Sequence, residues 1–94
     1  MQSVITVPKE TIGAVAFAAQ DVLSDSTQVA ERQSRLLRAM SLGNLYHHKV
    51  TITYQLHQQI TQRVEATVWA VTDQRVVLKG GRVIPIHAIE RVDW

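Results

Sequence analysis

The stretch KVTITYQL, residues 49–56, decides the fold because its hydropathy alternates with a period of two. Val50, Ile52 and Tyr54 alternate with threonines, which is the pattern of a β-strand with one buried face. The segment RVEATVWAVT, residues 63–72, continues the same alternation. The two segments therefore predict a pair of antiparallel strands joined as a hairpin.

Downstream of this pair, turn signals divide the sequence into short strands. These further strands are predicted at residues 75–79, 82–84 and 90–94. Gly80 and Gly81 supply the positive backbone angles that a tight hairpin turn requires, and Pro85 ends a strand because it lacks a backbone donor. Residues 86–89 suit one helical turn. Five strands this short protect their edges best by curling into a small antiparallel barrel.

Upstream of the pair, apolar residues recur every three or four positions and predict two helices. The first covers Lys9–Leu23 and is rich in alanine, a strong helix former. The second begins in the cluster Ser24–Thr27, where Asp25 has the residue type and spacing of a helix cap. It ends near Leu42, because Gly43 can adopt the left-handed conformation that terminates helices.

Length and composition suit one folded domain. The chain has 94 residues, of which 46% are apolar and 19% charged, enough to build a core and too little charge for disorder. It contains no cysteine, which excludes disulfides and thiolate metal sites, and the cytoplasm is the expected compartment. The longest apolar stretch, residues 12–19, is too short to cross a membrane, so we expect no membrane partner.

Four short motifs carry a resemblance to a known family. They are LGNL at residues 42–45, TVWAVTD at 67–73, LKGG at 78–81 and IPIH at 84–87. In this order they resemble a family of small, uncharacterised bacterial proteins with a helical lead-in and an SH3-like or Sm-like barrel. The resemblance implies an architecture and supplies no site residues.

The expected fold class is therefore α+β. Two N-terminal helices form a lead-in over residues 1–45, and a small five-stranded antiparallel SH3-like or Sm-like barrel follows over residues 46–94. Both parts belong to a single domain spanning residues 1–94.

The sequence carries no recognisable catalytic or metal-binding motif. Nucleophilic catalysis needs an activated Ser, Thr, Lys or Cys beside a base, and no local signature marks one. Adjacent His47 and His48 point to opposite sides of an extended chain, while His57 and His87 have no ligand-like spacing. We therefore expect a protein that is not an enzyme and uses no cofactor and no metal.

Trp69 and Val71 are the predicted partner-binding residues. In a strict alternation they lie on the face opposite Val64, Ala66 and Val68. If those smaller side chains fill the barrel, Trp69 and Val71 point outward and must be covered by a helix of the same chain or by another chain. The leading functional hypothesis is a protein-interaction or self-association module, with a protein partner or a homo-oligomer.

Basic residues near predicted strand ends support an alternative hypothesis. The net charge is only +2, but the excess lies in the second half of the chain. The candidate nucleic-acid-binding residues are Arg63, Arg75, Lys79, Arg82 and Arg91. They would bind RNA or single-stranded DNA if they converge on one rim of the barrel, whereas solvated strand edges explain the same residues without any nucleic acid.

Overall fold

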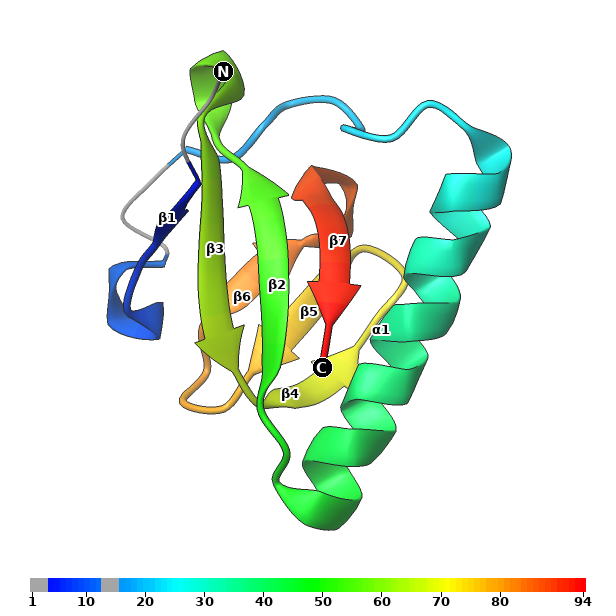
Figure 1. Ribbon diagram of the computed structural model, residues 1–94, viewed down its shortest axis with the longest axis vertical. Coiled ribbons are helices and arrows are strands. Elements are labelled where there is room, and N and C mark those ends of the chain that lie inside the picture. Colours follow the sequence, from blue (N-terminus) through cyan, green and yellow to red (C-terminus); the bar gives the residue numbers. More distant parts are fainter. Residues whose placement is uncertain (1–3, 13–15) are drawn as a thin grey trace.

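A four-stranded mixed sheet lies nearest the viewer in Figure 1, in a computed structural model that describes residues 4–12 and 16–94. Its strands stand in the order β1-β3-β2-β7. Their bounds are Ile5–Thr6 for β1, Val50–Gln55 for β2, Thr61–Ala66 for β3 and Ile89–Asp93 for β7. β1 runs parallel to β3, and the other neighbours are antiparallel.

A second, three-stranded antiparallel sheet lies behind the first (Figure 1), in the order β4-β5-β6. Its strands are Val68–Val71 for β4, Arg75–Leu78 for β5 and Val83–Pro85 for β6. Gly80 and Gly81 turn the chain between β5 and β6 with φ angles of 96° and 92°, as the glycine pair predicted. The predicted helical turn after Pro85 is also present, as the 3-10 helix η3 over Ile86–Ala88. Two further 3-10 helices are η1, Lys9–Thr11, and η2, His57–Gln59.

The long helix α1, Ser26–Tyr46, runs beside β7 and packs on β4 and β7 (Figure 1). Its start was predicted correctly: the Asp25 carboxylate accepts a hydrogen bond of 2.8 Å from the Thr27 backbone N–H. Its end was predicted too early, because α1 continues to Tyr46 and stops at His47, which has a left-handed backbone with φ 54°.

Gly43 is an interior residue of α1, where glycine serves close packing instead of helix termination. A Cβ atom at this position would overlap the backbone oxygen of Val68 and lie 3.1 Å from Cγ2 of Thr67. The absence of a side chain therefore lets α1 approach the start of β4 directly.

The core lies between the two sheets and the inner side of α1. Ile52, Tyr54 and Val64 come from the first sheet, Val76 comes from the second, and Leu36 comes from the helix; all are fully or almost fully buried. The alternation seen in residues 49–56 is thus confirmed, because the predicted apolar positions face this core.

The predicted helix over Lys9–Leu23 is wrong. Within its described part, only Lys9–Thr11 is helical, as η1; residues 13–15 lie outside the described residues. Residues 16–23, here called the strap, cross the ends of the sheets in an extended path. The strap pairs with distant segments instead of with itself: the Ala18 N–H donates to the Gln55 carbonyl at 3.1 Å, and the Val22 N–H donates to the His87 carbonyl at 2.9 Å. Phe17 stacks obliquely on Tyr54, with ring centroids 5.8 Å apart.

The predicted five-stranded barrel and the strand over residues 63–72 are also wrong. The run is split at Thr67, where the chain leaves β3 in the first sheet and enters β4 in the second. The described strands form two open sheets, and one described α-helix accompanies them where two were predicted. Closure is not needed to protect the edges at β4 and β7, because α1 packs against both strands. None of the described helices is long and apolar enough to cross a membrane.

Candidate functional site

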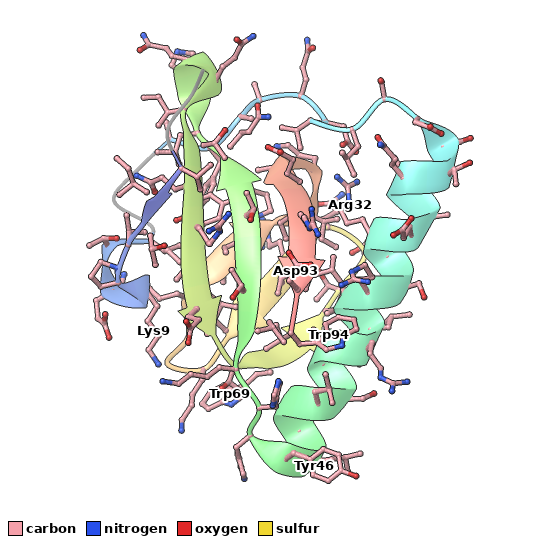
Figure 2. All side chains as sticks on the ribbon, viewed as in Figure 1. Lys9, Arg32, Tyr46, Trp69, Asp93 and Trp94 are labelled. Atoms are coloured by element: carbon pink, nitrogen blue, oxygen red, sulfur yellow. The ribbon has the colours of Figure 1, made fainter. Side chains whose placement is uncertain are left out.

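Exposed large apolar side chains occur in two parts of the described structure. The exposed set is Val4, Ile5, Leu37, Leu45, Tyr46, Ile60, Trp69 and Trp94. Val4, Ile5 and Ile60 lie in or near β1 and in the loop before β3. The others lie on α1, on β4 or just after β7, as the labelled aromatic residues in Figure 2 illustrate. The surface around α1 therefore carries most of the exposed aromatic side chains.

A groove runs along the outward side of α1. The inner side of the helix is buried through Arg32, Leu36, Ala39 and Gly43. The outward side carries Ser34, Leu37, Arg38 and Ser41, in which Ser34 and Leu37 have partners three and four residues further along the helix, respectively. Together with Glu31, Arg35 and Trp94, these residues border an open groove of about 530 Å³. Leu37 and Trp94, which are 45% and 50% exposed, make this surface partly apolar. We call this surface the α1 groove.

Arg35 holds Trp94 at the wall of the α1 groove. Its guanidinium carbon lies 4.4 Å from the centroid of the indole ring, a cation–π contact. The same side chain donates a hydrogen bond of 2.6 Å from Nε to the Val92 carbonyl and forms an ion pair of 3.5 Å with Asp93. The indole is consequently positioned beside α1 while remaining 50% exposed. Figure 2 shows Trp94 between the end of β7 and the helix.

Arginines of α1 also cover the open edge of β7. β7 is the last strand of its sheet, so its outer backbone groups have no neighbouring strand. Nη1 of Arg32 donates to the Ile89 carbonyl at 3.0 Å, and Arg35 binds the Val92 carbonyl as described above. These two bonds satisfy edge carbonyls and block strand addition at β7.

Arg32 is a nearly buried charge, 6% exposed, and Asp21 of the strap neutralises it. The two guanidinium nitrogens donate to the two carboxylate oxygens at 2.9 and 2.8 Å. These hydrogen bonds lower the pKa of Asp21 below its usual value, against the opposing effect of burial. Nε of Arg32 is buried and has no hydrogen-bond partner among the described residues. The pair fastens the strap to α1.

The two predicted partner-binding residues have different environments. Trp69 is 47% exposed, so a helix of the chain does not fully cover it. Val71, in contrast, is partly buried and packs against the core, so its predicted outward position is wrong. The register between β4 and β5 shifts between Val68 and Ala70, so that Val68 pairs with Leu78 and Val71 pairs with Val76. This bulge at Trp69 adds one residue and returns Val71 to the inner face.

The five predicted nucleic-acid-binding residues do not form one rim. Arg63 and Arg91 flank Thr53 across the first sheet, so they share its outer face. Arg75 begins β5, while Lys79 and Arg82 lie in the turn at the other end of that strand. Arg91 also pairs with Asp93 at 2.8 Å. The positive charges are therefore spread over at least two separate surfaces.

The histidines serve local structure where their contacts are defined. His47 ends α1, and Nε2 of His87 lies 2.6 Å from the Ala18 carbonyl, which it helps to hold. Among the residues described, no three His, Cys, Asp or Glu side chains group together as metal ligands. A cleft of about 500 Å³ beside His87 contains Arg32 and Arg75 but also Asp21 and Asp73, so its fixed charges balance.

Comparison with known proteins adds no further constraint on this site. No protein-family model matches the chain, and no curated protein or solved structure is significantly similar to it. The α1 groove is thus defined by this structure alone. Sequence reasoning missed it, because the helical pattern grouped Leu37 with the apolar stripe of Leu36 and Met40, which was expected to be buried. The position of Trp94 beside α1 had no sequence signal.

Proposed function

We propose that the chain is a non-catalytic protein-binding domain and that the α1 groove is its binding surface. The observation that supports this most is Trp94, a large aromatic side chain held half exposed by Arg35 against a helix that also exposes Leu37. Aromatic and arginine side chains are the residues that most often contribute strongly to protein interfaces. A tryptophan fixed in this way loses little conformational freedom when a partner covers it.

The electrostatics of the groove favour a protein over a nucleic acid. Arg35 and Arg38 border it, but so does Glu31, and Asp93 pairs with Arg35. A phosphate backbone requires a continuous positive track, whereas this surface offers charges of both signs beside the exposed side chains of Leu37 and Trp94. The mixture is typical of a protein interface with a polar rim.

Site-directed photo-crosslinking in the cells that naturally produce the protein tests the proposal. A photoreactive benzoylphenylalanine is placed at Leu37 and, as the matched control, at Glu65, an exposed residue on the outer side of β3. We expect crosslinked adducts from position 37 that are absent at position 65, and we expect Trp94→Ala to reduce them. Equal adducts at both positions, or none at either, would overturn the proposal. A gel shift with RNA that weakens with salt and disappears on replacing Arg75, Lys79 and Arg82 would support the nucleic-acid hypothesis instead.

A further inference from the structure

Two charges of opposite sign stand along the α1 groove without an intramolecular partner. Glu31 and Arg38 are both exposed, both border the groove, and neither forms an ion pair with any residue in the described ranges 4–12 and 16–94. They are seven residues apart, which is about two helical turns or 10.5 Å along the axis. One side of the helix therefore carries a negative and a positive charge at a fixed separation.

This arrangement is self-complementary under a two-fold axis. The axis lies midway between the two helices, perpendicular to both, at the level between Ser34 and Arg35. It places Glu31 of each copy opposite Arg38 of the other. The helices are then antiparallel, and the two ion pairs are equivalent by symmetry, as an isologous interface requires. Ser34 lies next to the axis, where a small side chain allows two helices to approach closely.

The shape of the surface agrees with this symmetry. Leu37 borders the groove together with Ser34, Ser41 and Trp94, so an exposed apolar side chain and the depression lie next to each other on the same helix. The two-fold axis brings Leu37 of each copy to the Glu31 and Ser34 end of the groove on the other copy. Each copy thus supplies the apolar side chain that the other can receive.

We propose that the occupant of the α1 groove is a second copy of this chain, bound with the two α1 helices antiparallel. This inference rests on the proposed function, because it names the partner of the same surface. With the axis at the level between Ser34 and Arg35, residues 26–43 of the two α1 helices overlap over about 27 Å. A contact about 10 Å wide along this overlap covers roughly 270 Å² per copy before Trp94 is added. Standard interfaces cover about 800 Å² per partner. The expected dimer is therefore weak and reversible.

Charge-reversal variants test the inference. Sedimentation velocity measures the fraction of dimer at micromolar to millimolar protein concentrations. Glu31→Arg places two positive charges opposite each other at both symmetric positions, and Arg38→Glu does the same with negative charges. We expect each single variant to dimerise at least about tenfold more weakly than the wild type at low salt. The double variant Glu31→Arg/Arg38→Glu restores both pairs and the dimer. An equimolar mixture of the two single variants also forms a dimer, because the charges then complement each other.

Two results would overturn the inference in different ways. If the single variants dimerise as well as the wild type, or if their mixture stays monomeric, the antiparallel arrangement is wrong. If the wild type is monomeric throughout while benzoylphenylalanine at position 37 still crosslinks to a different protein in cells, the proposal that a second copy fills the groove is wrong and the proposed binding surface stands. If the wild type is monomeric and position 37 gives no adduct, both proposals fail. Circular dichroism of each variant checks that the fold is retained.

Discussion

Replacing Gly43 by alanine should destabilise the protein, although the same change in most helix interiors is stabilising. Glycine costs an α-helix about 1 kcal/mol relative to alanine, so Gly43→Ala gains that amount from propensity alone. The new Cβ, however, overlaps the backbone oxygen of Val68. Overpacking of this kind costs about 1–3 kcal/mol, and here the cost is at the upper end because the obstacle is backbone that no side-chain rotation can move.

The net effect is a loss of about 1–2 kcal/mol in the free energy of unfolding. Because 1 kcal/mol shifts the midpoint of a domain of this size by about 4–8 °C, the expected decrease in Tm is roughly 5–15 °C. Urea unfolding followed by circular dichroism measures the free energy, at one fixed protein concentration so that self-association does not change between variants.

Two further variants make the test specific. Asn44→Ala changes the next residue, which is exposed, and should stabilise the protein by a few tenths of a kcal/mol. Thr67→Ser removes the Cγ2 contact but leaves the Val68 oxygen in place, so it should not rescue Gly43→Ala. If Gly43→Ala is as stable as the wild type, or if Thr67→Ser restores it, the close approach of α1 to β4 is wrong.

Three other predictions concern the strap and the core. Asp21→Asn leaves the Arg32 charge without its anion and should cost about 1–2 kcal/mol in urea unfolding, less than for a fully buried pair because Asp21 is partly exposed. Folding lowers the pKa of Asp21, so its contribution to the free energy of unfolding is present above its ordinary pKa and is lost as the pH falls through the lower folded value. Asp21→Asn should therefore make the free energy of unfolding less dependent on pH in acid. Burial raises the pKa of Tyr54 to about 12 from 10.0. Its contribution to the free energy of unfolding is therefore complete below pH 10 and is lost as the pH rises towards 12. Tyrosinate absorbance of the Tyr46→Phe variant, in which Tyr54 is the one remaining tyrosine, measures this pKa. Ionisation of Tyr54 near pH 10 without unfolding would contradict the prediction.

The parts of the fold that sequence reasoning predicted correctly are those decided by local chemistry. Asp25 caps α1 because its carboxylate reaches an N–H two residues away. Gly80 and Gly81 form a turn because both have positive φ angles. The alternation of residues 50–55 places one side of β2 in the core. Each of these features depends on neighbours in sequence, so a short pattern was sufficient.

The parts that were predicted wrongly depend on distant contacts. The strap reads as a helix by composition, but Phe17 packs on Tyr54 and the backbone of Ala18 pairs with Gln55. Such tertiary contacts outweigh a weak local propensity. Alternation across residues 63–72 likewise gave no sign that Thr67 changes sheets or that a bulge at Trp69 reverses the inner and outer faces.

The candidate site was only partly visible for the same reason. Trp69 was singled out and is half exposed, yet Trp94 is the tryptophan that borders the α1 groove. Its position is set by Arg35, which lies 59 residues away in the sequence and binds the edge of β7 as well. No spacing rule connects a helix residue to a terminal aromatic residue, so this contact required coordinates.

Symmetric disulfide formation tests the central claim most directly, because the chain has no cysteine of its own. In the antiparallel dimer Ser34 lies about 1.5 Å along the helix axis from its counterpart, whereas Ser41 lies about 20 Å from its own. A disulfide needs Cα atoms within about 7 Å. We predict that Ser34→Cys forms a covalent dimer under mild oxidation and that Ser41→Cys does not. Equal crosslinking of the two variants, or none by Ser34→Cys at millimolar concentration, would contradict the account.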